Sequence, residues 1–345
     1  MAALPESAAF FSLATCSLAN GTPFAALVMG EQVLALNAAS GFLQGQRLHL
    51  PRADTVLKLL ESWSSSLPVL QRIATAFVHE GVEELRRAAV PLTTLHLHPP
   101  VNVPRQIFCS GANYKKHVIQ LHVAQTFHKN EGMTPGERLK EGTRMMDERA
   151  RTGTPFFFCK AQSSVSGPCD PIVLPADVTQ PDWELELGVV IGKPARRVAR
   201  AVALEHVAGY VVVNDITSRD RVNRKDMKEM GMDWVASKCA PSFLPMGPYL
   251  VPAAFVPDPQ QLQITLKLNG QTMQDESTAD MIFGVARLIE TLSTFCLLQP
   301  GDLICTGSPA GNGMHYGRFL QPGDVVEGSI SGLGAQRNTC VAESG

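Results

Sequence analysis

Two glutamates lie two residues apart at the start of an apolar run, in the stretch PDWELELGVVIGK at residues 181–193. Because successive side chains of a strand point to opposite faces, Glu184 and Glu186 share one face of the predicted strand. Two like charges on one face repel each other and weaken the strand, and a bound divalent cation removes that repulsion. The alternative interpretation is a half-exposed strand with a solvated polar face.

A third carboxylate follows the next apolar run, because Asp215 comes directly after the stretch GYVVVN. A carboxylate at the end of a core strand must be exposed, paired or bound to a metal. Taken alone, Asp215 is typical of a turn. Taken with Glu184 and Glu186, it supplies the oxygen ligands that Mg²⁺ or Mn²⁺ prefers, whereas Ca²⁺ requires more protein oxygens. The residue types therefore favour a site for Mg²⁺ or Mn²⁺.

The composition excludes several other classes of protein. The 345 residues are 45% hydrophobic and 6% aromatic with a net charge of −2, which argues against nucleic acid and membrane surfaces as partners. No apolar stretch has the length of a membrane span, and no basic segment precedes the first apolar residues as in a secretory signal. The eight cysteines form no CxxC pair, so we expect reduced thiols, no structural zinc and a cytoplasmic location.

The elements that position these residues divide the chain in two. Residues 1–98 predict a small N-terminal α/β domain, with a β-hairpin turning near Gly30 and a helix broken at Pro68. Residues 99–345 contain eight short apolar strands separated by glycine and proline, typical of a β-rich barrel, roll or sandwich. A charged insert at 123–154 predicts a lid-like helix, with Thr134 as its N-cap and Glu137 completing a capping box.

From about residue 95 onward the chain resembles the fumarylacetoacetate hydrolase family. The resemblance rests on six segments in the order of the family, and together they are far more specific than any one of them. The segments are GANYKKH (111–117), WELELGVVIGK (183–193), VAGYVVVNDITSRD (207–220), SKCAPSFLPMGPYLV (237–251), LKLNGQTMQDESTADMIF (266–283) and GDLICTGSPAGNG (301–313).

The resemblance implies an α+β, predominantly β fold with a mixed β-roll or sandwich catalytic domain, and a homodimer. It implies that Glu184, Glu186 and Asp215 hold the metal, and that the substrate is a small molecule with a 2-oxo acid or β-diketone unit. Members of the family hydrolyse carbon–carbon bonds of acylpyruvates. Related proteins decarboxylate, hydrate or isomerise similar compounds, and these reactions share a metal-bound enolate.

The resemblance also implies roles for individual residues. His117 is the candidate general base, because a histidine takes up a proton near neutral pH. The alternative interpretation is that His117 has only a structural role at the start of a helix. Lys238 adds positive charge near the developing enolate, unless it is a surface lysine, and Lys160 helps to hold the site. Three further residues are expected to bind substrate: Tyr114, Arg219 and Thr306. The alternative for Thr306 is a hydroxyl that stabilises a turn.

Several positions depart from the pattern of the family. Gln120 stands where small hydrolytic relatives carry the glutamate that orients the histidine, so it is the candidate orienting partner of His117. Its amide can fix the tautomer of His117 by hydrogen bonding, but an amide stabilises an imidazolium less than a carboxylate does. Val222 and Pro241 replace an expected glutamine and aspartate. The charged insert offers three substitutes for the missing carboxylate, Glu131, Glu137 and Glu141, and His122 and His128 are further candidates.

Three hypotheses follow for the function. The leading one is a metal-dependent hydrolase that cleaves a carbon–carbon bond in a 2,4-diketo acid or related β-diketone. The second is a decarboxylase, hydratase or isomerase of a similar 2-oxo acid, which the changes at Gln120 and Val222 favour because proton transfer on an enolate needs no activated water. The third is a non-catalytic relative that keeps the fold as a binding module.

Overall fold

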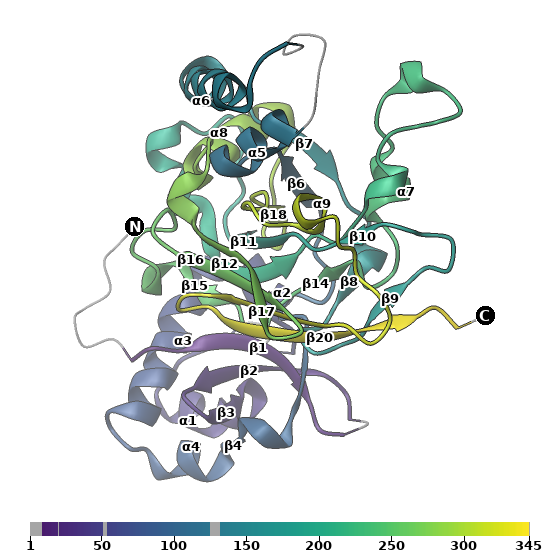
Figure 1. Cartoon of the computed structure of the whole chain (residues 1–345). Helices are drawn as coiled ribbons and strands as arrows, with labels where there is room; N and C mark the ends of the chain where they lie inside the picture. The colour runs from purple at the N-terminus through teal and green to yellow at the C-terminus, as the bar shows by residue number, and fades with distance from the viewer. Residues whose placement is uncertain (1–8, 20, 51–53, 125–131, 345) are drawn as a thin grey trace.

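The computed structural model describes residues 9–19, 21–50, 54–124 and 132–344 of the chain. Helices and strands are interspersed along the chain, and three sheets of five or six strands form the frame. Figure 1 shows the N-terminal sheet at the bottom of the molecule and helix α6 at the opposite end. The predicted α+β class is confirmed, whereas the domain boundary at residue 98 stays a prediction.

The N-terminal sheet has the strand order β4-β3-β2-β1-β5. The predicted hairpin is present, because β2 pairs with β3 around Gly30, whose positive φ of 62° suits a residue without a Cβ. These elements are β1 (Ser12–Ser17), β2 (Phe24–Met29), β3 (Gln32–Ala35), β4 (Val90–Pro91) and β5 (His96–His98), with helices α1 (Ser40–Gly45), α2 (Val56–Glu61), α3 (Trp63–Val78) and α4 (Glu83–Ala88).

The predicted helix break at Pro68 is wrong. Helix α3 continues through Pro68, and the break falls at Ser62, between α2 and α3. Helix α3 buries a long apolar stripe that includes Leu70 and Ile73. Burial of this stripe outweighs the one backbone hydrogen bond that proline removes.

Two larger sheets form the frame of the rest of the chain. One has the order β15-β12-β11-β18-β6-β7 and the other β17-β16-β19-β20-β9. Their faces approach closely at Gly328, where an added Cβ would lie 2.5 Å from a Leu185 methyl group. The strands are β6 (Ile107–Gly111), β7 (Phe156–Cys159), β9 (Ile172–Leu174), β11 (Leu185–Ile191), β12 (Val207–Asn214), β15 (Val251–Pro252), β16 (Gln263–Leu268), β17 (Gln271–Ser277), β18 (Leu303–Cys305), β19 (Val325–Ile330) and β20 (Gly334–Ala342).

Short elements surround the central strands. The predicted capping box at the start of α6 is confirmed, because Thr134 accepts from the Glu137 backbone N–H and Glu137 accepts from that of Thr134. Arg287 donates to two carbonyls at the other end of α6. The remaining elements are β8 (Val165–Ser166) with β14 (Leu244–Pro245), β10 (Pro181–Asp182) with β13 (Thr217–Ser218), and helices α5 (Lys115–Ala124), α6 (Pro135–Thr152), α7 (Trp234–Lys238), α8 (Val285–Phe295) and α9 (Gly313–Tyr316). Within the described ranges, none of the helices has the length and apolar character needed to cross a lipid bilayer.

Asp324 ties three segments together before β19. Its carboxylate accepts from Asn269 Nδ2 at 2.8 Å, from Arg318 Nη2 at 2.7 Å and from the Gln321 backbone N–H at 2.7 Å. Burial alone would raise the pKa of Asp324, but these hydrogen bonds hold it below its usual value. The ionised carboxylate therefore stabilises the folded chain above the unfolded pKa, and this contribution is lost as the pH falls.

Replacing Asp324 by asparagine should lower the free energy of unfolding by about 2 kcal/mol at pH 7, because the charge-assisted hydrogen bonds weaken. The difference from the wild type should shrink below about pH 4, where the wild-type carboxyl also becomes neutral. Urea unfolding at both pH values checks this, with the exposed Asp54→Asn as control. An equal loss at pH 7 and at low pH would show that the charge of Asp324 is unimportant.

Candidate functional site

Two neighbouring strands bring the three predicted acidic residues together. In the register of β11 and β12, Leu185 pairs with Asn214, so Glu184 precedes one strand where Asp215 follows the other. The Asp215 backbone N–H donates to the Glu184 carbonyl at 2.8 Å. Glu186 lies on the same face of β11 as Glu184. One oxygen from each of the three carboxylates lies within 4.8 Å of the other two, and all three residues are buried.

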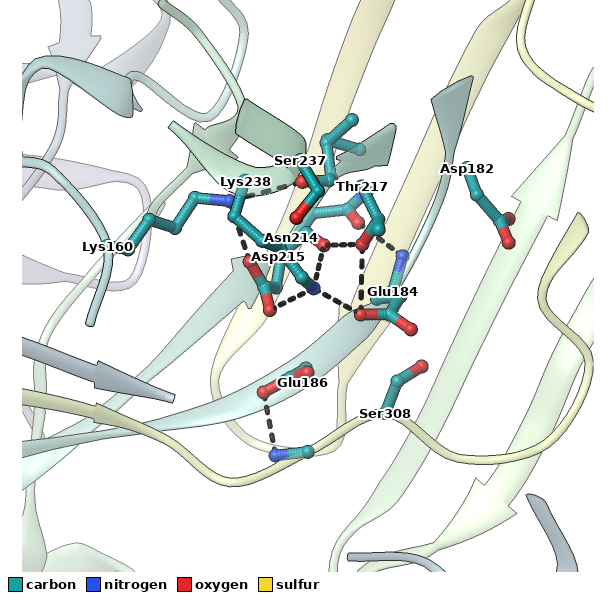
Figure 2. A network of polar contacts seen from close by, with 12 residues as sticks. Lys160, Asp182, Glu184, Glu186, Asn214, Asp215, Thr217, Ser237, Lys238 and Ser308 are labelled. Carbon is teal, nitrogen blue, oxygen red and sulfur yellow. Dashed lines mark hydrogen bonds and ion pairs between the residues drawn. The ribbon is translucent and has the colours of Figure 1, made fainter. Parts of the chain in front are cut away.

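Two lysines hold the carboxylate cluster from one side. Lys238 Nζ donates to Glu184 Oε2 at 2.6 Å and to Asp215 Oδ2 at 2.5 Å. Lys160 Nζ donates to Asp215 Oδ1 at 2.6 Å. Figure 2 shows these contacts, with the carboxylates of Glu184, Glu186 and Asp215 directed toward one another. Lys238 is therefore a buried member of the cluster, and its alternative interpretation as a surface lysine is wrong.

Arg219 holds the cluster from a second side. Its guanidinium donates to Glu184 Oε1 at 2.5 Å and to Asp182 Oδ2 at 2.8 Å. Asp182 is completely buried and also accepts from the Gly313 backbone N–H at 2.5 Å. Asp182 thus joins the metal-ligand candidate Glu184, through Arg219, to the turn that begins α9.

Glu184 and Glu186 differ in the balance between burial and the charges around them. Burial alone would raise the pKa of Glu184, but Arg219 and Lys238 outweigh burial and hold that pKa well below its usual value. Burial and the nearby Asp215 raise the pKa of Glu186 well above its usual value. Among the described residues, Glu186 has a hydrogen bond from the Gly307 backbone N–H at 2.7 Å but forms no ion pair, and the nearby Lys238 opposes the rise in its pKa without outweighing it. A divalent cation would supply the positive charge that this carboxylate lacks, so the residues present fit a metal ion.

A cavity of about 180 Å³ lies over the acidic cluster. His117 lines it from α5 and is only 7% exposed. Burial lowers the pKa of His117 to about 4, with Glu184 opposing this shift and Arg219 and Lys238 adding to it. The imidazole is therefore neutral at physiological pH and able to accept a proton. The other lining residues are Ser110, Gly111, Ala112, Phe158, Glu184, Glu186, Asp215, Arg219, Trp234, Lys238 and Ser308.

The family model for the fumarylacetoacetate (FAA) hydrolase C-terminal domain matches residues 106–341, which include every residue of this cavity. The chain belongs to the fumarylacetoacetate hydrolase family. The match covers more than half of the chain and contains all the strands of the two larger sheets except the last residue of β20.

Relatives within the family carry out different reactions. The chain is 46% identical over 186 residues to a 2,4-didehydro-3-deoxy-L-rhamnonate hydrolase from Sphingomonas sp. (strain SKA58), a match that spans 53% of this chain and 64% of that protein. It is 33% identical over 293 residues to an oxaloacetate tautomerase from Xenopus laevis, spanning 82% of each protein.

A solved member of the family resembles almost the whole chain. The crystal structure of maleylpyruvate hydrolase from Sphingobium sp. SYK-6, in complex with manganese(II) and pyruvate, superposes with a TM-score of 0.68 at 25% identity. The superposition covers 96% of this chain and 100% of that one. The shared fold agrees with the predicted resemblance to the fumarylacetoacetate hydrolase family. A keto-acid hydrolase among the structural neighbours agrees with it as well.

Gln120 is one of the positions that depart from the family pattern. It lies on α5 one turn after His117, yet no hydrogen bond joins the two side chains, and Gln120 does not line the cavity. Its Oε1 is buried without a hydrogen-bond partner among the described residues. The proposed orienting role of Gln120 therefore has no support in the geometry. Val222 and Pro241 also lie outside the cavity lining.

The charged insert does not supply the missing carboxylate from its described residues. Glu137 completes the capping box of α6, and Glu141 pairs with Arg144 at 2.7 Å. His122 is on α5 but does not line the cavity. Glu131 and His128 lie outside the described residues. Since no described residue of 123–154 lines the cavity, the lid function of this insert stays a prediction.

Two of the residues predicted to bind substrate are fully buried away from the cavity. The Thr306 hydroxyl donates to the Leu187 carbonyl at 2.9 Å, so it joins the end of β18 to the neighbouring strand β11, and the contact is not within a turn. Tyr114 is completely buried, and neither residue lines the cavity. Ser308, two residues after Thr306, does line it. Sequence reasoning missed Ser308 although it lies in the quoted motif, because the motif alone does not show which hydroxyl faces the cavity.

Proposed function

We propose that this protein is a metal-dependent hydrolase that cleaves a carbon–carbon bond in a small 2,4-diketo acid. The observation that carries the proposal is the juxtaposition of three buried carboxylates with a buried, neutral histidine around one cavity. Glu184, Glu186 and Asp215 would hold Mg²⁺ or Mn²⁺, and Ca²⁺ fits less well because only three protein residues offer oxygen. When bound, such an ion acts as a Lewis acid toward the 2-oxo acid end of the substrate.

The residues of the chain perform the remaining steps. His117 Nε2 or Nδ1 accepts a proton from a water molecule, which then attacks the distal carbonyl carbon of the substrate. The bond between that carbon and the central methylene breaks, and its electron pair forms the enolate of the 2-oxo acid product. The methylene carbon of this enolate then takes the proton from His117, which gives the 2-oxo acid and restores the neutral histidine. Lys238 is held by Glu184 and Asp215, so its ammonium group acts on the negative charge that develops nearby through its positive charge and not through a direct hydrogen bond.

A second candidate function is tautomerisation or decarboxylation of a 2-oxo acid. It is favoured by the His117 ring, which no hydrogen bond fixes among the described residues, and by the tautomerase relatives that match most of the chain. Proton transfer on an enolate needs a base in the cavity but no oriented water. Both candidate functions use the same acidic cluster, so only the identity of the reaction products distinguishes them.

Nuclear magnetic resonance of the reaction products distinguishes the two candidates. The Mg²⁺-loaded protein incubated with acetylpyruvate should release pyruvate and acetate in equal amounts, and the same protein treated with a chelator should release neither. Enol exchange or decarboxylation of oxaloacetate without cleavage of acetylpyruvate would overturn the hydrolase and support the second function. No metal-dependent reaction with any substrate would support the non-catalytic alternative. The homodimer and the cytoplasmic location stay predictions from the resemblance.

A further inference from the structure

An aromatic wall forms the part of the cavity beyond the acidic cluster. The rings of Phe158 and Trp234 stack with centroids 4.4 Å apart and an interplanar angle of 12°. Both rings line the cavity. A third ring, that of Phe156, packs against Trp234 at 5.8 Å but does not line the cavity and is 40% exposed.

The two rings of the aromatic wall come from β7 and α7, and each of these elements lies next to or contains one lysine of the cluster. Phe158 lies two residues before Lys160 at the end of β7, a spacing that places both side chains on one face of an extended chain. Trp234 lies four residues before Lys238 on α7, a spacing that places both on one helix face. The Lys238 ammonium lies 5.2 Å from the centroid of the Phe158 ring. A small molecule anchored at the carboxylate cluster therefore extends onto the aromatic wall.

The charges around the cavity argue against a second carboxylate at the distal end of that molecule. Among the described lining residues, the side chains that are cationic at neutral pH are Lys238 and Arg219. Lys238 is engaged by Glu184 and Asp215, and Arg219 by Glu184 and Asp182. A distal carboxylate would also face aromatic rings, whose faces carry partial negative charge. Desolvating it there without a free cationic partner is unfavourable.

We propose that this cavity selects 2-oxo acids whose distal end is a short, uncharged hydrocarbon group, and that Phe158 and Trp234 determine this specificity. The inference rests on the proposed function, because it places the 2-oxo acid end of the ligand at the acidic cluster. The cavity volume of about 180 Å³ favours a distal group of a few carbons, since it lies well below the ~300 Å³ of typical drug-sized sites.

Calorimetric titration of the Mg²⁺-loaded protein tests the proposal with two ligands of equal size. Oxaloacetate and 4-methyl-2-oxopentanoate differ only in a carboxylate against an isopropyl group. We expect 4-methyl-2-oxopentanoate to bind at least about tenfold more tightly. In the series pyruvate, 2-oxobutanoate and 2-oxopentanoate, each added methylene should tighten binding about fourfold as it is buried on the rings. Equal or tighter binding of oxaloacetate would overturn the proposal.

Variants of the aromatic cluster locate the effect. Trp234→Ala and Phe158→Leu should each reduce the gain in affinity per added methylene of the 2-oxo acid. The dissociation constant of pyruvate should change by no more than about threefold. Phe156→Leu is the matched control, because it loosens the same ring cluster without reaching the cavity, and it should keep the wild-type dependence. An unchanged dependence in both cavity variants would also overturn the proposal. If pyruvate itself does not bind the Mg²⁺-loaded wild type, both the proposed function and the proposed specificity are overturned. If pyruvate binds but oxaloacetate binds more tightly than 4-methyl-2-oxopentanoate, only the specificity is overturned.

Discussion

Replacing Glu186 by glutamine should abolish the response to divalent metal while leaving the metal-free protein at least as stable as the wild type. The two effects have opposite signs for one physical reason. Burial and Asp215 raise the pKa of Glu186, so a charged carboxylate at this position destabilises the fold unless a cation is present. Glutamine keeps the size of the side chain and an oxygen that accepts from the Gly307 backbone N–H, but it removes the charge.

Thermal unfolding with and without Mg²⁺ measures both effects. At a metal concentration of about 100 times the dissociation constant, the wild type should gain about 2.7 kcal/mol, and Glu186→Gln should gain almost nothing. Turnover of acetylpyruvate should fall by about three orders of magnitude. Glu327→Gln, on the half-exposed strand β19, is the control and should match the wild type. A variant that loses stability without metal, yet still responds to Mg²⁺, would contradict the assignment of Glu186 as a ligand.

Replacing His117 by asparagine should reduce kcat by about 10² to 10⁴ while pyruvate binding to the Mg²⁺-loaded protein stays nearly unchanged. His117 faces the cavity but is not one of the three acidic residues, so its loss removes a base and not a ligand. His79→Asn, an exposed position at the end of α3, is the control. A parallel loss of pyruvate binding in His117→Asn would show that His117 binds the substrate instead of accepting a proton.

The pH dependence of kcat/KM gives a second test of the role of His117. The base acts in its neutral form, and burial lowers its pKa from 6.5 to about 4. The wild-type rate should therefore stay level as the pH falls from 8 to about 5 and should decline only near pH 4 or below, since bound metal lowers the pKa of His117 further. A decline centred near pH 6.5 would indicate a solvent-exposed histidine as the base.

The sequence predicted two members of the acidic cluster because strand geometry is local. The period of two along β11 places Glu184 and Glu186 on one face whatever the rest of the chain does. The capping box at Thr134 and the hairpin at Gly30 are equally local, and both are present. Pro68 shows the limit of this reasoning, because burial of α3 against the core outweighs the local preference of proline, and no local pattern contains that information.

The aromatic wall and the surroundings of His117 could not be predicted in the same way. Phe158 and Trp234 lie 76 positions apart in the chain, and their stacking depends on how α7 packs beside β7. The spacing of each from its lysine was visible in the sequence, but nothing showed that the two faces meet. Likewise, Gln120 and Thr306 occupy motif positions, and only the packing shows that neither side chain faces the cavity.

X-ray diffraction from crystals grown with Mn²⁺ and pyruvate, collected at the manganese absorption edge, would locate the metal directly. We predict one strong anomalous peak within about 2.5 Å of an oxygen from each of Glu184, Glu186 and Asp215, with the pyruvate oxygens completing the coordination. Anomalous density elsewhere, with Glu186 still bonded to Gly307 and no ion beside it, would contradict the proposed metal site and the chemistry that depends on it.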